Sequence, residues 1–268
     1  MKALATSFGA LLAIAAAIYV GLLALLWFGQ EKLIFLPTPL PADHRFGHGP
    51  DVHEVWIDVH GARLHALHLK LARPDGIVFY LHGNAGNLDG WFANPDFYRR
   101  LNLDLFMLDY RGYGKSGDRI TSEAQLHADV RAAWQQVAPA YAGTRRVILG
   151  RSLGSGPALV LAAEAKPELT LLVSPYLSFA ALAAQYYPWV PRFLLRYPMR
   201  NDLAIARVTT PIALLHGERD EVIDAEHSRR LQALAPQARL TIVPGAGHND
   251  LQAFPAYLDA VAAALRGP

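Results

Sequence analysis

Residues 147–156 read Val-Ile-Leu-Gly-Arg-Ser-Leu-Gly-Ser-Gly, and an alanine-rich stretch follows them. The apolar residues at the start predict a short buried strand, and residues 153–165 have the period of a helix. Between strand and helix, Gly150 and Gly154 flank Ser152 in the pattern G-x-S-x-G. Because glycine relieves crowding at a sharp turn, this arrangement predicts that the Ser152 hydroxyl is lifted into the open as a candidate nucleophile.

Similar apolar runs lie on both sides of this junction. They lack polar alternation, as is typical of strands buried on both faces, and they cover residues 77–81, 105–108, 147–149, 169–173, 211–215 and 240–243. Helix-period stretches alternate with them at residues 97–101, 122–137, 153–165, 225–234 and 254–265. An alternating hairpin pattern at residues 53–71 comes first. The order predicts an α/β domain with a mostly parallel central sheet and helices on both faces.

Two later loops carry groups that could activate the serine. A serine hydroxyl needs a base to take its proton, and the base needs a third group that fixes its tautomer. Asp220 and His248 lie in the loops after the last two apolar runs. Since loops at the carboxyl ends of parallel strands meet at one edge, Ser152, Asp220 and His248 are predicted to form a catalytic triad. Glu218 is the substitute acid, and the alternative for Asp220 is a turn residue or helix cap.

Acyl transfer also needs hydrogen-bond donors that face the tetrahedral oxyanion. The backbone N–H of Leu153, directly after the nucleophile, is the first candidate. The second is the backbone N–H of Asn84, within the glycine-rich turn His-Gly-Asn-Ala-Gly-Asn at residues 82–87. The alternative for Asn84 is an ordinary turn without a catalytic part.

Composition excludes several other classes. With 52% hydrophobic and 18% charged residues, the chain has ample material for a core, and a net charge of +2 without a basic face gives no indication of a nucleic-acid partner. Since the chain has no cysteine, disulfides, thiolate metal sites and a lipid-modified cysteine are excluded. Gly114-Lys115-Ser116 lacks the glycine that a phosphate-binding loop needs five residues earlier. His65 and His68 face opposite sides of a predicted strand, so no metal site is expected there. No cofactor is expected either, because the predicted triad supplies its own nucleophile and base.

The first thirty residues form the largest anomaly. Residues 3–30 contain no charged side chain, and they are long enough to cross the hydrocarbon core of a bilayer as a helix. Residues 1–30 are therefore predicted to be an uncleaved single-pass anchor, with a cleaved signal peptide or a core helix as alternatives. We expect a plasma (inner) membrane location with the catalytic domain on the outer or periplasmic side.

The rest of the chain divides into three predicted parts. Residues 31–51 contain a proline cluster that favours an extended stalk, and residues 52–268 form the catalytic domain. Residues 175–210, rich in aromatic side chains, form a small cap in that domain. The cap either lines an acyl-chain pocket or touches the bilayer, or it contains a short helix whose aromatic residues simply pack on the core.

Five motifs together resemble a known superfamily. They are HGNAG at 82–86, DYRGYGKS at 109–116, GRSLGSG at 150–156, HGERDEVID at 216–224 and GAGHND at 245–250. From residue 52 onward the chain resembles α/β-hydrolases, and more narrowly the membrane-tethered serine hydrolases that include ABHD-type protein depalmitoylases. The resemblance implies the α/β-hydrolase fold, the triad Ser152, Asp220 and His248, and an oxyanion hole at Asn84 and Leu153.

The expected activity is cleavage of small or lipid-like acyl esters or thioesters through an acyl-enzyme, with acyl chains of short to medium length. The alternative is a tethered, non-catalytic scaffold of the same fold that binds a lipid or protein partner.

Overall fold

The structure is a computed structural model, and it describes residues 2–267. Its strands are β1 (Val52–Val59), β2 (Ala62–Leu69), β3 (Gly76–Leu81), β4 (Leu103–Leu108), β5 (Arg145–Arg151), β6 (Leu169–Val173), β7 (Ile212–Gly217) and β8 (Ala238–Val243). Its helices are α1 (Lys2–Ile34), α2 (Leu88–Trp91), α3 (Pro95–Arg100), α4 (Glu123–Val137), α5 (Ser155–Ala165), α6 (Phe179–Tyr186), α7 (Asn201–Ile205), α8 (Glu226–Leu234) and α9 (Pro255–Arg266). Short 3₁₀ turns lie at Ala138–Tyr141, Ser152–Gly154, Arg192–Leu194 and Leu251–Ala253.

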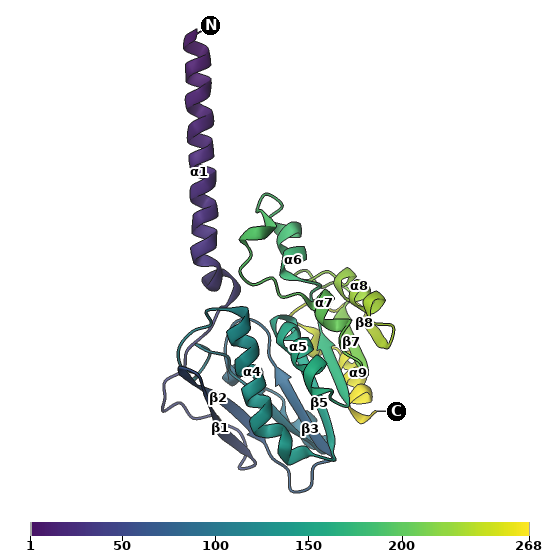
Figure 1. The fold of residues 1–268 in the computed structure, drawn as a ribbon. Helices are drawn as coiled ribbons and strands as arrows, with labels where there is room; N and C mark the ends of the chain where they lie inside the picture. Colours follow the sequence, from purple (N-terminus) through teal and green to yellow (C-terminus); the bar gives the residue numbers. More distant parts are fainter. Residues whose placement is uncertain (1, 268) are drawn as a thin grey trace.

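The strands form one eight-stranded sheet in the order β1-β2-β4-β3-β5-β6-β7-β8. The hairpin β1–β2 is antiparallel and joins β4 antiparallel, whereas all pairs from β4 to β8 are parallel. Figure 1 shows α4 and α5 on one face of this sheet and α9 on the other. The predicted mostly parallel sheet with helices on both faces is thus confirmed.

Two hydrophobic cores cover the two faces of the sheet, and neighbouring residues of one strand belong to different cores. On β3, Phe79 packs with Phe106 and Trp134 under α4, while Val78 belongs to the core under α9. Both Phe79 and Val78 are fully buried. Because side chains alternate across a strand, burial on both faces removes the polar alternation, which explains the continuous apolar runs of the sequence.

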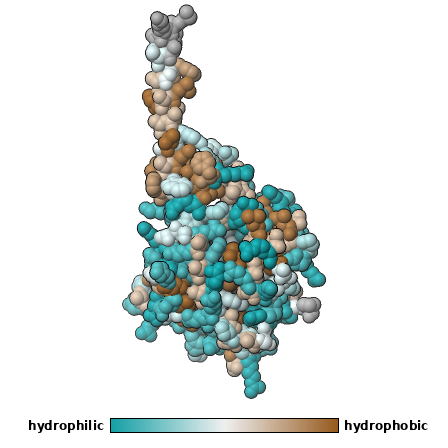
Figure 2. All heavy atoms as spheres, viewed as in Figure 1, coloured by the Kyte–Doolittle hydropathy of each residue, from teal (hydrophilic) through white to brown (hydrophobic). Residues whose placement is uncertain are grey.

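Helix α1 stands away from the domain in Figure 1, and its surface in Figure 2 is mostly apolar. Among the residues that the structure describes, it is the one helix whose length and composition would allow it to cross a membrane, over Thr6–Ile34. The most apolar window of this helix is not buried against the domain. A signal sequence meets the same length criterion, so this finding establishes a candidate span.

The segment after α1 is extended, but it lies along the domain. Thr38 donates its backbone N–H to Gly86 at 3.0 Å, and Leu40 donates to Gly114 at 2.8 Å. Gly114 donates in return to the carbonyl of Thr38 at 3.2 Å. The prolines lack a donor, so the residues between them supply the pairing. This part of the predicted stalk therefore forms a short strand-like contact with the loops after β3 and β4.

Candidate active site

The loop after β5 holds Ser152 in a sharp turn. The backbone of Ser152 has φ of +49°, in the left-handed region, and the 3₁₀ turn Ser152–Gly154 leads directly into α5. A Cβ atom on Gly154 would lie 2.0 Å from the carbonyl oxygen of Leu81, and one on Gly150 would lie 2.5 Å from Cβ of Ala158. Gly150 therefore allows β5 and α5 to approach closely, and Gly154 allows the start of α5 to approach the end of β3, which together permit this turn.

The structure brings Ser152, His248 and Asp220 together from the loops after β5, β8 and β7. Nε2 of His248 lies 3.1 Å from Oγ of Ser152, and Nδ1 of His248 lies 2.8 Å from Oδ2 of Asp220. Asp220 and His248 are buried, at 8% and 7% exposure, and Ser152 is partly exposed. Both distances are within hydrogen-bond range, so a proton can move along the line from serine to imidazole.

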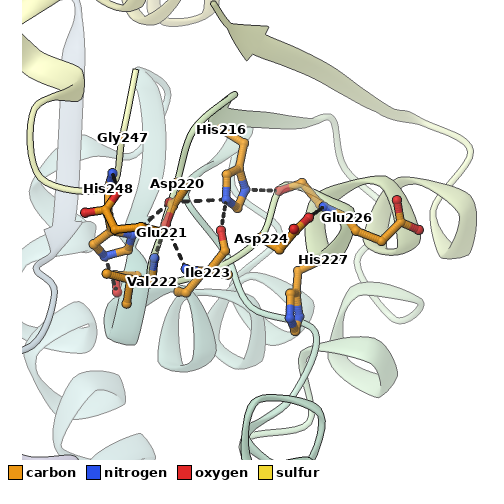
Figure 3. Close-up of polar contacts among 12 residues, drawn as sticks. His216, Asp220, Glu221, Val222, Ile223, Asp224, Glu226, His227, Gly247 and His248 are labelled. Carbon is orange, nitrogen blue, oxygen red and sulfur yellow. Dashed lines mark hydrogen bonds and ion pairs between the residues drawn. The ribbon is translucent and has the colours of Figure 1, made fainter. Parts of the chain in front are cut away.

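Asp220 is held as a carboxylate. Its Oδ1 accepts backbone N–H groups of Val222 at 3.0 Å and Ile223 at 2.7 Å, and its Oδ2 also lies 3.2 Å from Nε2 of His216 (Figure 3). Burial alone would raise the pKa of Asp220, but hydrogen bonds from His216, His248 and Ile223 outweigh it and hold the pKa well below its usual range. The ionised carboxylate keeps the proton of His248 on Nδ1, which leaves Nε2 free to accept from Ser152.

His216, at the end of β7, is a site residue that sequence reasoning missed. Its ring is fully buried; Nε2 lies 2.6 Å from the carbonyl of Ile223, and Nδ1 lies 2.6 Å from Oγ of Ser228. Because Nε2 faces only oxygen acceptors, we assign its proton there, and Ser228 then donates to Nδ1. The available signal was the motif His-Gly-Glu-Arg-Asp, which places His216 four residues before Asp220.

Glu218, the substitute acid, has a different contact. Its Oε2 accepts the backbone N–H of Gly245 at 2.9 Å, which ties the loop after β7 to the loop after β8. Oε2 of Glu221 accepts the backbone N–H of His248 at 3.3 Å. Asp220 is thus the acid in contact with the imidazole of His248. Glu218 and Glu221 instead hold the loop after β8, which carries His248.

The loop after β3 passes close to the nucleophile. A Cβ atom on Gly83 would lie 3.4 Å from Cβ of Ser152 and 2.9 Å from Cη2 of Trp91. Oδ1 of Asn84 accepts the backbone N–H groups of Leu36 at 3.0 Å and of Ala85 at 2.8 Å. The Asn84 side chain therefore fixes the turn beside Ser152. Leu153, the other oxyanion candidate, begins the turn into α5 and is buried.

Tyr113 links this turn to the segment after α1. Its hydroxyl donates to Oδ1 of Asn84 at 2.9 Å and accepts the backbone N–H of Leu36 at 3.2 Å. The ring of Tyr113 is fully buried. Sequence reasoning assigned this tyrosine to a motif without a role, because its contact depends on how three loops approach one another.

The cap contacts α1. Nε2 of Gln30 donates to the carbonyl of Leu194 at 2.7 Å, and Oε1 of Gln30 accepts the backbone N–H of Arg196 at 2.9 Å. Glu31 forms an ion pair with Arg196 at 2.8 Å and accepts from the hydroxyl of Tyr197 at 3.0 Å. The end of α1 is therefore fixed to the cap by buried and partly buried polar contacts.

Several aromatic side chains of the cap are exposed rather than packed on the core. The exposed fractions are 48% for Tyr186, 56% for Tyr187, 47% for Trp189 and 81% for Phe193. Trp189 lies beside α1, where its carbonyl accepts from the hydroxyl of Tyr19 at 3.0 Å. Tyr197 of the same segment is instead fully buried and contacts the ring of Phe35, so the aromatic residues of the cap divide between exposed positions and positions packed on the core.

A cavity near the site is formed by other elements. It has a volume of about 720 Å³ and lies between the loop after β3 and α9. Asn84, Trp91, Arg151 and Asn249 line the part that adjoins the site, and no cap residue lines it among the residues described. Ser152, Asp220 and His248 do not line this cavity, but Arg151, the residue before Ser152, does, so the cavity adjoins the Ser152 turn.

His65 and His68, the two histidines of the β2 strand, have separate hydrogen-bond partners. Nε2 of His65 lies 2.8 Å from Glu54, and Nε2 of His68 lies 2.9 Å from the hydroxyl of Tyr141. Within residues 2–267, no group of three histidine, cysteine or acidic side chains is arranged to hold a metal ion.

A serine turn after β5, an acid after β7 and a histidine after β8 on a mostly parallel sheet are the arrangement of an α/β-hydrolase. A family model described as serine aminopeptidase, S33, matches residues 72–203. An uncharacterized protein of Mycobacterium tuberculosis is 33% identical over 247 residues, 89% of this chain and 87% of that protein. The chain therefore belongs to the α/β-hydrolase family, as predicted.

Other relatives agree with this assignment. Human alpha/beta hydrolase domain-containing protein 17C is 32% identical over 189 residues, which are 68% of this chain and 55% of that protein. This match confirms the resemblance to the ABHD group. An esterase from Pyrococcus furiosus has the same fold, with a TM-score of 0.67 at 19% identity over 87% of this chain and 97% of the esterase.

Proposed function

We propose that this protein is a membrane-anchored serine hydrolase that cleaves carboxylic acyl esters or thioesters of short to medium acyl length through an acyl-enzyme. The observation that carries the proposal is the position of His248, whose two ring nitrogens lie 3.1 Å from Ser152 and 2.8 Å from Asp220. This geometry supplies both the proton acceptor and the group that orients it.

The reaction proceeds in two halves. Oγ of Ser152 attacks the carbonyl carbon of the substrate while Nε2 of His248 takes the hydroxyl proton. The tetrahedral oxyanion accepts hydrogen bonds from the backbone N–H groups of Leu153 and Asn84. The intermediate collapses, and His248 gives its proton to the departing alcohol or thiol, which leaves the acyl group on Ser152. Water then attacks the acyl-enzyme with His248 as base, and the acid leaves as Ser152 regains its proton.

Helix α1 is the membrane anchor in this proposal. Its apolar surface from Thr6 onward and the aromatic pair Trp27 and Phe28 near its end support a single span with an interfacial belt. The cap around α6 lies on the same side of the domain as α1 (Figure 1), and the cap has exposed aromatic residues, which supports contact of the cap with the bilayer. We place the catalytic domain on the periplasmic side of the plasma membrane, and a topology reporter fused after α9 tests this orientation.

A fluorophosphonate probe tests the chemistry, because it labels only an activated serine. The detergent-solubilised full chain should form an adduct on Ser152, located by mass spectrometry, and both Ser152→Ala and His248→Ala should abolish it. Ser122→Ala is the matched control. The Ser122 hydroxyl caps α4, where it accepts the backbone N–H of Gln125, so it has a structural contact outside the triad. Absence of labelling in a folded wild-type protein would refute the proposal and favour a non-catalytic scaffold that binds a lipid or protein partner.

A further inference from the structure

Arg151, the residue before the candidate nucleophile, is a buried cation without a carboxylate. Its side chain is 3% exposed, and no acidic group within residues 2–267 forms an ion pair with it. Arg111 is equally buried but pairs with Asp129 at 2.6 Å and Asp118 at 3.0 Å. A charge removed from water is costly unless a countercharge or hydrogen bonds replace the water. Two carboxylates compensate the charge of Arg111, whereas no described carboxylate pairs with Arg151.

The contacts of Arg151 satisfy only part of its guanidinium. Nη2 donates to the carbonyl of His248 at 2.9 Å, and the face of Trp91 lies 5.2 Å from the guanidinium carbon. Nε is buried and has no hydrogen-bond partner among the described residues. The hydroxyl of Tyr80 also hydrogen-bonds to Arg151. A carbonyl, a neutral hydroxyl and an aromatic ring position a cation but leave its charge uncompensated.

Arg151 lines the cavity of about 720 Å³ that adjoins the Ser152 turn. Tyr257 and Gln252 add polar groups to the same cavity, and apolar side chains such as Leu258 and Val261 also line it. The single acid among the described lining residues is Asp89, which is exposed and lies 2.9 Å from Nε2 of His44. The cavity therefore contains one buried positive charge and no buried negative charge.

We propose that this cavity binds a carboxylate or phosphate group of the substrate through Arg151, so that the enzyme prefers acyl esters that carry an acidic group. This inference rests on the proposed function and narrows its substrate class. The anion would pair with guanidinium N–H groups of Arg151 other than the buried Nε, and the apolar lining would contact the hydrocarbon between the acidic group and the ester. Asn84 and Trp91 belong both to the cavity and to the surroundings of Ser152, which brings the ester within reach of the nucleophile.

The first experiment compares charged and neutral substrates on the wild-type full chain. One arm uses mono-4-nitrophenyl esters of dicarboxylic acids of increasing length against their methyl-capped neutral counterparts. The other arm uses acylglycerol phosphates against acylglycerols. We expect kcat/KM for the best anionic substrate to exceed that of its neutral partner by about 10- to 100-fold, as hydrogen bonds to charged groups usually give.

The second experiment changes the arginine. Arg151→Gln should reduce the anionic-to-neutral ratio of kcat/KM to about one, because an amide keeps a donor without the charge. Arg131→Gln is the matched control. It removes a surface guanidinium on α4 that pairs with Glu164 on α5, and it should keep the wild-type ratio. An equal loss of activity on both substrates would instead mean that Arg151 only positions His248, and it would overturn the inference.

The outcomes separate the two proposals. Equal hydrolysis of charged and neutral esters by the wild type, in both arms, would overturn the anion site and leave the serine hydrolase intact. Failure to hydrolyse any ester, together with failure to react with the fluorophosphonate, would remove both. If Arg151→Gln does not fold, the wild-type ratio still decides the question.

Discussion

Replacement of His216 tests how the acid of the site is held. His216→Leu removes the donor at 3.2 Å from Asp220 and leaves the carbonyl of Ile223 and the hydroxyl of Ser228 without their partner. Buried polar groups left unpaired cost about 1–3 kcal/mol each, and a hydrogen bond to a charged group contributes about 1.5–3 kcal/mol. Because the Ser228 hydroxyl can rotate, we expect a loss of about 3–6 kcal/mol in the free energy of unfolding, or a melting temperature lower by about 10 °C or more.

Catalysis should suffer less than stability. Asp220 keeps its backbone donors Val222 and Ile223, so it remains ionised at neutral pH and kcat should fall by only about tenfold. His216→Gln is the matched control, because its amide nitrogen can replace Nε2 as donor to the same oxygens. It should recover most of the stability.

The pH dependence has a definite sign. Because the folded-state pKa of Asp220 is lowered, its stabilising contribution is present above the unfolded value and is lost as pH falls below about 4. His216→Leu removes part of this contribution, so the stability gap between wild type and variant should be widest near neutral pH and should narrow in acid. Thermal unfolding in detergent from pH 7 to pH 3 measures the gap. A variant as stable as wild type, or a glutamine variant as damaged as the leucine variant, would refute the reasoning.

Five further substitutions have distinct expected outcomes. Ser152→Ala should lower kcat by about six orders of magnitude, measured by ester hydrolysis against a no-enzyme blank. Asp220→Asn should lower kcat by about four orders of magnitude, whereas Glu218→Gln should change it by less than about tenfold. Gly154→Ala should lower the melting temperature, at a cost of about 3 kcal/mol or more, because its Cβ would lie 2.0 Å from a backbone oxygen. Asn84→Ala should lower kcat by about tenfold or more, with less effect on KM, since it releases the turn beside Ser152.

Contrary results would be equally specific. Full activity of Asp220→Asn together with loss of activity in Glu218→Gln would make Glu218 the orienting acid. An unchanged melting temperature for Gly154→Ala would mean that β3 and α5 are less closely packed than described. Unchanged kcat for Asn84→Ala would show that the turn keeps its shape without the three donors to Oδ1.

The site residues that sequence reasoning found share a local signature. Ser152 lies between two glycines at a strand–helix junction, and Asp220 and His248 each follow a recognisable buried strand. Each signal is contained in fewer than ten residues, so no knowledge of tertiary contacts is needed to read it.

The residues that it missed depend on contacts between distant segments. His216 and Tyr113 acquire their roles only when separate loops meet, and Arg151 is notable only because no acid among residues 2–267 forms an ion pair with it. The short helices α2 and α7, of four and five residues, are too brief to leave a periodic pattern. The insertion of β4 between β2 and β3 likewise follows from packing rather than from order along the chain.

The strand-like segment after α1 has a practical consequence for anyone who wishes to produce the domain without α1. The backbone of Leu36, Thr38 and Leu40 hydrogen-bonds directly to the turns around Asn84 and Gly114. A truncation that starts at residue 52 would therefore remove hydrogen bonds that hold the loops after β3 and β4. A version that begins at Phe35 would lack α1 and retain all of these bonds. Differences in turnover between the two truncations would then measure how far the segment between α1 and β1 supports the catalytic loops.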